Sequence, residues 1–145
     1  MNLFLRSKTA IVTGGASGIG EAIVRQLAEE GAYPVIFDKN IAKALELVRD
    51  LEAKGQPSYA LEIDLTDEAA CKHAIDSRLE KYGHIDILVN NAGRNDGVKL
   101  GSPLADFRRS LEINLVHFYT KANYCMEALI ATKGNIINIA SKVAV

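Results

Sequence analysis

Hydrophobic and polar positions along the chain follow two patterns. Short continuous apolar runs are typical of buried strands, and longer segments with apolar residues every three or four positions are typical of helices with one covered face. The runs predict strands at residues 10–12, 34–37, 58–63, 85–89 and 136–139. A helix is expected in each interval between them, and the last, over residues 104–132, is the longest.

Glycines and small polar residues predict where these helices begin and end. Ser17 and Thr66 are suited to cap the first and third helices, because a hydroxyl can accept a bond from a free N–H group. Gly31 and Gly83 are placed to stop the same two helices. Strict alternation of strand and helix predicts a parallel sheet covered on both faces, a doubly wound α/β fold of the Rossmann type.

The turn after the first strand is rich in glycine, with the sequence TGGASGIG at residues 13–20. Gly14 allows a tight turn, Gly18 allows the main chain to approach a pyrophosphate, and Gly20 allows the helix to pack closely. With Ser17 at the helix start, free N–H groups would face an anion. The spacing GxxxGxG favours dinucleotide binding, although a merely tight strand-to-helix turn would have the same pattern.

Polar residues also follow the other predicted strands. They are Asp38, Asp64, residues 90–93 and Ser141. Because ligands of doubly wound sheets bind outside the carboxyl ends of the strands, these residues are expected to converge with the glycine turn around one ligand. This convergence supports dinucleotide binding more strongly than the glycine turn alone.

Asp38 lies where a carboxylate can accept hydrogen bonds from the adenosine ribose hydroxyls, which favours NAD over NADP. Lys39 could soften the repulsion of a ribose phosphate, and a helix-capping role for Asp38 is the alternative. Asp64 and Leu65 are expected to hold the adenine, by hydrogen bonding and by contact. A plain capping role for Asp64 remains open.

Asn114 falls within the apolar stripe of the long helix. The stripe consists of Leu104, Phe107, Leu111, Leu115, Phe118, Ala122, Cys125 and Leu129. A buried amide costs roughly 1 to 3 kcal/mol unless it finds partners, so Asn114 is expected either to bond a neighbouring strand or to hold a water near a reacting centre. Arg108 and Arg109 are expected on a solvated or subunit-contact face.

Composition excludes several classes of protein. The 145 residues are enough for one domain, and the formal net charge of −1 without a basic cluster argues against nucleic-acid binding. The N-terminal apolar patch is too short for a signal-peptide core or a membrane span, so a cytoplasmic protein is expected. Cys71 and Cys125 are expected as buried free thiols, and no metal site is expected. His117 lies beside the apolar stripe of the long helix and is expected to be a surface or core histidine.

Taken together, several motifs resemble the short-chain dehydrogenase/reductase superfamily. They are TGGASGIG at 13–20, Asp38, Asp64-Leu65, NNAG at 90–93, Asn114-Leu115 and INIAS ending at Ser141. The resemblance implies hydride transfer between a carbon bearing a hydroxyl and NAD, with Ser141 orienting the substrate oxygen and Asn114 positioning a relay water. The long helix would be a subunit contact in a homo-tetramer. Cofactor contacts are implied for Gly14, Ser17, Gly18, Ile19, Gly20, Asp38, Asp64, Leu65, Asn90, Ala92 and Gly93.

Three stretches, NNAGRNDGVKL, HFYTKANYC and INIASKVAV, are more narrowly similar to the L-fucose dehydrogenase branch. Enzymes of that branch oxidise the anomeric carbon of a free sugar to a lactone. The resemblance implies that Asn95 and Asp96 bind sugar hydroxyls. A 3-oxoacyl thioester reductase, which shares the superfamily motifs, and a non-catalytic nucleotide-binding module are the alternatives.

The superfamily runs its reaction with a Tyr and a Lys four residues later, and no tyrosine of this sequence has such a partner. We therefore expect residues 1–145 to be a single dinucleotide-binding domain, the N-terminal portion of a longer dehydrogenase domain. Its sheet is expected to be incomplete at the C-terminal side, and the chain alone is expected to be inactive.

Overall fold

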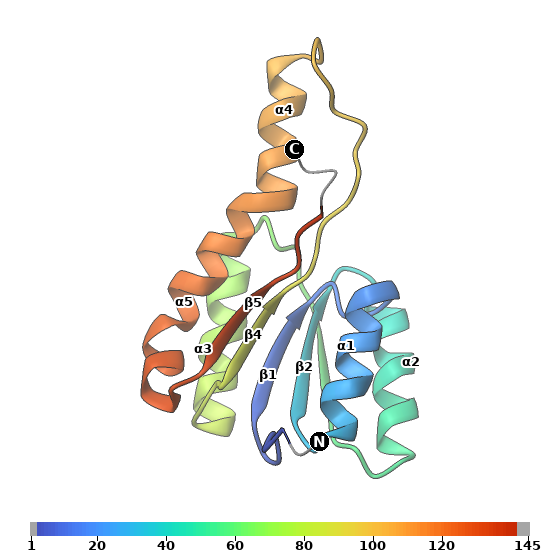
Figure 1. Cartoon of the computed structure of the whole chain (residues 1–145), viewed down its shortest axis with the longest axis vertical. Coiled ribbons are helices and arrows are strands. Elements are labelled where there is room, and N and C mark those ends of the chain that lie inside the picture. The colour runs from blue at the N-terminus through green and yellow to red at the C-terminus, as the bar shows by residue number, and fades with distance from the viewer. Residues whose placement is uncertain (1–2, 142–145) are drawn as a thin grey trace.

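A five-stranded parallel sheet forms the centre of the molecule, in the order β3-β2-β1-β4-β5 (Figure 1). The computed structural model describes residues 3–141. The strands are β1 (Thr9–Thr13), β2 (Tyr33–Asp38), β3 (Tyr59–Glu62), β4 (Ile87–Asn90) and β5 (Asn135–Asn138). All five predicted strands are present, with ends displaced by one or two residues.

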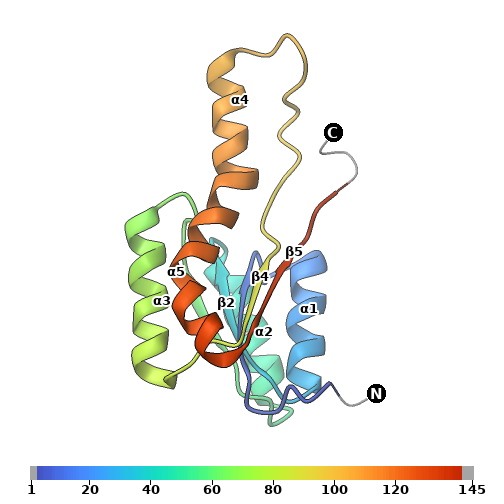
Figure 2. The ribbon, with the colours of Figure 1, turned by 60° about the vertical axis from the view of Figure 1, so that its left-hand side comes forward.

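Helices cover both faces of this sheet, as the alternation of strand and helix predicted (Figures 1 and 2). One face carries α1 (Gly18–Glu29) and α2 (Ile41–Glu52), and the other carries α3 (Glu68–Tyr82) and α5 (His117–Thr132). The doubly wound Rossmann-like fold is therefore confirmed, as a partial fold of five strands.

The core is split into two apolar layers by the sheet. On β1, Ala10 and Val12 belong to the layer under α1 and α2, whereas Ile11 between them belongs to the layer under α3 and α5. Ile36 and Phe37 on β2 divide in the same way, because successive side chains of a strand point to opposite faces. Continuous apolar strands are needed here because both faces are covered.

The order of the strands reverses beside β1. The chain moves from β1 outward to β2 and β3, then returns to the other side of β1 to form β4 and β5. The connections that follow β1 and β4 therefore lead to helices on opposite faces of the sheet. In doubly wound folds this switch point is where ligands bind.

The long helix differs from its prediction. It consists of α4 (Leu104–Leu111), a π-helical segment η1 (Glu112–Val116) and α5. The first half of the predicted stripe is open to solvent, with Leu104 60% and Leu115 58% exposed, while Cys125 and Leu129 are buried. Two causes combine: α4 projects past the carboxyl edge of the sheet (Figure 2), and the wider π turn changes the direction in which successive side chains point.

The predicted helix starts need two corrections. Asp67, and not Thr66, is the N-cap of α3, and its side chain accepts a hydrogen bond from the Ala70 N–H group. Ser17 occupies the N-cap position of α1, but its side chain makes no capping bond. Gly31 and Gly83 take the positive φ angles expected at helix ends.

Cys71 and Cys125 are buried free thiols, as expected. Within residues 3–141, no helix has the length and apolar character needed to cross a membrane.

Candidate functional site

The glycine-rich turn joins β1 to α1 and packs so closely against its neighbours that two of its glycines have no room for a side chain. Gly14 has φ +65°, and a Cβ atom there would lie 2.9 Å from the Cα atom of Ala92. A Cβ atom at Gly20 would overlap the carbonyl oxygen of Gly14 and lie 2.5 Å from the Nδ2 atom of Asn91. Gly18, at φ +57°, faces open space. The turn therefore needs glycine at Gly14 and Gly20 for packing, and at Gly18 for its backbone angle.

Asn91 fastens the loop after β4 to this turn. Its Nδ2 atom donates to the carbonyl oxygens of Thr13 and Gly14, each at 3.1 Å. The Thr13 hydroxyl oxygen accepts from the N–H groups of Asn91 at 3.0 Å and Ala92 at 3.1 Å. The sequence motif at 90–93 contained this residue, but its side-chain role depends on two strands being neighbours and was not predicted.

Asn90 itself does not line the cavity, although it was expected in the cofactor wall. Its side chain is fully buried and donates to the Phe118 carbonyl oxygen at 3.3 Å and to the Asn138 Oδ1 atom at 3.0 Å. Because side chains alternate along a strand, Asn90 points into the layer under α5 while Asn91 reaches the glycine turn. Its visible role is to join β4, β5 and α5.

Asp38 stands at the end of β2 beside the glycine turn. Its Oδ2 atom accepts from the Ala16 N–H group at 3.0 Å, and its Oδ1 atom accepts from the Asn40 N–H group at 2.8 Å. Asn40, and not Asp38, is the N-cap of α2. The capping alternative for Asp38 is thus wrong, and the half-buried carboxylate is held in place at the cavity edge.

Asp64 forms an ion pair with Lys39 at 2.9 Å across the ends of β2 and β3. It also accepts from the Thr66 N–H group at 2.9 Å and the Thr66 hydroxyl at 2.7 Å. The hydrogen bond from Lys39, followed by those from Thr66, lowers the pKa of Asp64 to about 2. Asp64 is therefore ionised at neutral pH. The alternative that Asp64 caps α3 is wrong, because the N-cap of that helix is Asp67.

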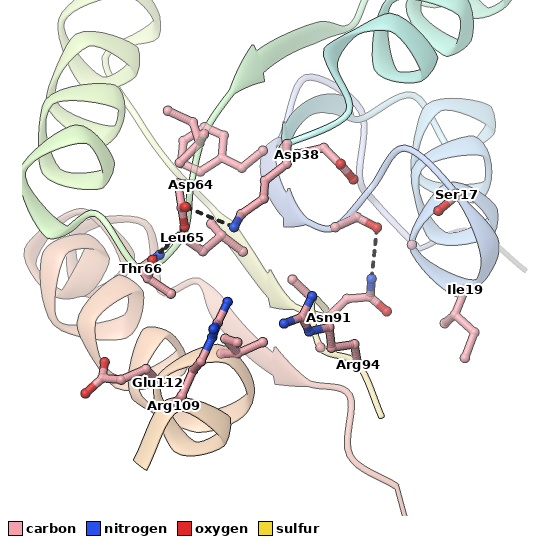
Figure 3. Close-up of a pocket in the computed structure, with 18 residues that line it drawn as sticks. Ser17, Ile19, Asp38, Asp64, Leu65, Thr66, Asn91, Arg94, Arg109 and Glu112 are labelled. Carbon is pink, nitrogen blue, oxygen red and sulfur yellow. Dashed lines mark hydrogen bonds and ion pairs between the residues drawn. The ribbon is translucent and has the colours of Figure 1, made fainter. Parts of the chain in front are cut away.

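These residues surround a cavity of about 930 Å³ at the carboxyl edge of the sheet (Figure 3). Its lining includes nine of the predicted residues: Gly14, Ser17, Ile19, Gly20, Asp38, Asp64, Leu65, Ala92 and Gly93. Gly18, Asn90, Asn95, Asp96, Asn114 and Ser141 are not among the lining residues. Most of the predicted cofactor residues are thus brought together, and the predicted catalytic and sugar-binding residues are not.

Two arginines that the sequence did not assign to the site also line the cavity. Arg109 comes from α4 and Arg94 from the loop after β4, and Figure 3 shows both beside the same opening. Arg109 was expected on a solvated or subunit-contact face. The apolar stripe gave no signal for this placement, because Arg109 lies outside it.

Asn114 lies in that π turn and is half-buried. Its Oδ1 atom accepts from the Arg94 N–H group at 2.8 Å, and its Nδ2 atom donates to the Ser110 hydroxyl oxygen at 3.3 Å. The prediction that its amide finds a partner is confirmed, but the partner is the loop after β4 and not a strand. Asn114 thereby fixes the backbone next to Gly93 in the cavity wall.

The other predicted substrate residues are on the surface. Asn95 and Asp96 are exposed, and their Oδ1 atoms accept from the N–H groups of Gly97 and Val98 in the same loop. A hydrogen bond from Ser110 is the main cause that lowers the pKa of Asp96. Ser141 is exposed beyond the end of β5.

A dinucleotide suits this cavity. The glycine turn leaves the start of α1 uncovered by side chains, so main-chain N–H groups and the positive end of the helix are available to a diphosphate. A fixed carboxylate, Asp38, lines the same cavity beside the glycine turn. No group of His, Cys, Asp or Glu suited to hold a metal ion is present among residues 3–141.

Comparison with known proteins gives a consistent result. The short chain dehydrogenase family matches residues 8–145. The 7alpha-hydroxysteroid dehydrogenase of Escherichia coli (strain K12) is 38% identical over 118 residues, which are 81% of this chain and 46% of that protein. The L-fucose dehydrogenase of Mus musculus is 36% identical over 138 residues, covering 94% of this chain and 49% of that protein.

Solved structures show the same likeness. A 7 alpha-hydroxysteroid dehydrogenase complexed with NADH and 7-oxo glycochenodeoxycholic acid superposes with a TM-score of 0.92 at 35% identity, over 99% of this chain and 56% of that one. A metagenomic short-chain oxidoreductase in complex with NADP superposes with a TM-score of 0.89 at 34% identity, over 94% of this chain and 63% of that one. The chain spans about half the length of the curated relatives it matches. With the sheet order, the glycine turn and the converging strand ends, these matches show that the chain belongs to the short-chain dehydrogenase family of oxidoreductases.

Proposed function

We propose that the protein is an NAD-dependent dehydrogenase of a sugar or similar small alcohol, and that residues 1–145 form its dinucleotide-binding domain. When bound, the nicotinamide ring accepts or donates the hydride. Main-chain N–H groups of the glycine turn hold the diphosphate, and Asp64 and Leu65 contact the adenine. Because the sequence has no Tyr followed by Lys four residues later, this chain binds the cofactor without turning substrate over.

The position of Asp38 is the observation that carries the choice of NAD. Its carboxylate is fixed by the Ala16 and Asn40 N–H groups, so it cannot easily turn away from a ribose. A phosphate on that ribose, about 4 Å from the carboxylate, would be repelled by about 4 kcal/mol at an effective dielectric constant near 20. Lys39 does little to relieve this repulsion, since Asp64 already pairs with its ammonium.

Catalytic roles are proposed for Asn114 and Ser141. Ser141 orients the substrate oxygen, and Asn114 holds a water that relays a proton. Asn114 lies in η1 and Ser141 lies beyond the end of β5, and neither side chain lines the cavity itself. The bond from the Arg94 N–H group to Asn114 joins η1 to the cofactor wall.

An L-fucose-like aldose, oxidised at its anomeric carbon, is the proposed substrate. Asn95 and Asp96 would meet the sugar hydroxyls from the loop that leads into α4. The likeness to L-fucose dehydrogenase of Mus musculus supports a sugar. The matching likeness to 7alpha-hydroxysteroid dehydrogenase makes a steroid alcohol the substrate to test beside it.

Calorimetric titration of the chain with NAD and with NADP tests the cofactor proposal. We expect NAD to bind at least about ten-fold more tightly, a difference of about 1.4 kcal/mol. Asp38→Asn should reduce that ratio. Asp76→Asn changes a carboxylate of α3 that does not line the cavity and should leave the ratio unchanged. Tighter binding of NADP by the unaltered chain, or no binding of either nucleotide, would contradict the proposal.

We propose that the complete protein forms a homo-oligomer, a tetramer, and that the long helix is the contact between subunits. Exposed apolar side chains follow one another along α4, η1 and α5: Leu104, Phe107, Leu111, Leu115, Tyr119, Met126 and Ile130. A patch of this kind is typical of a protein–protein contact. Sedimentation velocity should show self-association that Leu115→Glu weakens, and a monomer at all concentrations would refute this contact.

A further inference from the structure

A lysine with no access to solvent lies on α5. Lys121 is 0% exposed, and its ammonium donates to the Leu65 carbonyl oxygen at 2.6 Å and to the Thr120 hydroxyl oxygen at 3.2 Å. No ion pair within residues 3–141 includes it. A buried ammonium without a carboxylate is costly, so a methionine or leucine would be expected if packing were its only task.

One imidazole and two thiols interact with Lys121, and none of them supplies a negative charge. Burial, followed by the charge of Lys121, lowers the pKa of His117 to about 4, so that imidazole is neutral. Burial raises the pKa of the Cys71 thiol despite the nearby ammonium, and it raises the pKa of Cys125 to about 12. Both thiols are therefore protonated at neutral pH, and the Leu65 carbonyl oxygen is the closest acceptor of the ammonium.

That carbonyl belongs to the segment 63–66, which lines the cavity between β3 and α3 (Figure 3). The segment is anchored at its start by the Ile63 N–H group, which donates to the Asp38 carbonyl oxygen at 3.1 Å. At its other end, the N–H group of Asp67, the next residue, donates to the Asp64 carbonyl oxygen at 3.0 Å. Lys121 holds it from behind, across a sequence separation of 56 residues.

We propose that Lys121 is a positioning residue for the nucleotide base: its ammonium fixes the Leu65 carbonyl and thereby aims the Leu65 and Asp64 side chains at the adenine. This inference rests on the proposed function, because it presumes that a nucleotide occupies the cavity. The diphosphate is held elsewhere, by the glycine turn on α1. Loss of Lys121 should therefore weaken binding of the base and spare binding of the diphosphate.

Lys121→Met removes the ammonium and keeps most of the side-chain volume. In calorimetric titrations we expect this variant to bind AMP about ten-fold more weakly than the unaltered chain and to bind inorganic pyrophosphate equally well. Amide hydrogen exchange of the free protein should become faster at Ile63 and Asp67 and remain unchanged in α1. Lys72→Met, which removes an exposed lysine on α3, is the matched control and should change none of these.

Lys121→Gln keeps a donor for the Leu65 carbonyl and should bind AMP with an affinity between those of the unaltered chain and Lys121→Met. If Lys121→Met does not fold, about three-fold weaker AMP binding by Lys121→Gln with unchanged pyrophosphate binding is the expected result. If Lys121→Met and Lys121→Gln bind AMP as tightly as the unaltered chain, the role proposed for Lys121 is wrong. Equal weakening of AMP and pyrophosphate binding would also contradict that role. Neither result would contradict the proposed function. Failure of the unaltered chain to bind AMP, NAD and pyrophosphate overturns the proposed function, and this inference with it.

Discussion

Replacing Gly20 by alanine tests the packing of the glycine turn. At most helix positions this change stabilises the folded protein by up to about 1 kcal/mol, because alanine forms helices more readily than glycine. Here the new methyl group would overlap the Gly14 carbonyl oxygen and lie 2.5 Å from the Nδ2 atom of Asn91. Both are held by neighbouring strands, so neither can move without loss of other contacts.

The expected magnitude follows from these contacts. Overpacking against fixed atoms costs about 3 kcal/mol, and displacing Asn91 sacrifices two hydrogen bonds to Thr13 and Gly14, worth about 1 kcal/mol each. Subtracting the helix gain leaves a net destabilisation of about 4 to 5 kcal/mol. Urea unfolding followed by circular dichroism measures this change as a lower midpoint.

Two other glycines provide controls. Gly18→Ala and Gly55→Ala both place a side chain at positive φ with nothing within 4 Å, so each should cost about 1 to 2 kcal/mol from backbone strain alone. Of these two, only Gly18→Ala should also weaken pyrophosphate binding. A Gly20→Ala protein as stable as Gly55→Ala would refute the close packing that we assign to this turn.

Further predictions concern the long helix. Asn114→Ala should lower the free energy of unfolding by about 1 to 2 kcal/mol, because two hydrogen bonds are lost. In a catalytically complete protein the same change should strongly reduce turnover. A large fall in melting temperature with normal specific activity would leave only a structural role for Asn114. His117 has a folded pKa of about 4 against an ordinary 6.5, so the unfolded state binds its proton first, and stability that is complete above pH 6.5 should fall by up to about 3 kcal/mol as the pH drops to 4. His117→Leu should flatten this acid dependence in urea titrations at successive pH values, and an unchanged slope would contradict the assignment. The exposed stripe around Leu115 should bind a hydrophobic dye, and absence of dye fluorescence would count against it.

Several features of the site were predictable because they depend on neighbours in the sequence. The positive φ of Gly14 and the close packing of Gly20 follow from a strand, a glycine turn and a helix in succession. Asp38 and Asp64 reached the same cavity because parallel strands end at one edge of the sheet. For these residues, local pattern and fold topology were enough.

Other features depended on contacts that no local pattern contains. Asn90 and Asn91 are adjacent in a polar motif, and only the pairing of β4 with β1 and β5 decides which of them reaches the glycine turn. Lys121 follows Thr120 in the sequence and was not singled out by any pattern, yet the docking of α5 brings it to the Leu65 carbonyl. Arg109 lines the cavity because α4 and the π turn carry it past the sheet edge.

The sequence by itself determined the succession of strands and helices along the chain, the doubly wound class and the position of the glycine turn. These features depend on apolar periodicity and glycine conformations, which act over a few residues. The tertiary structure alone decided which polar side chains face the cavity, where the long helix changes its pitch and which charged group is buried. Those outcomes depend on how segments far apart in the chain pack against each other, because a side chain's surroundings are set by its neighbours in space.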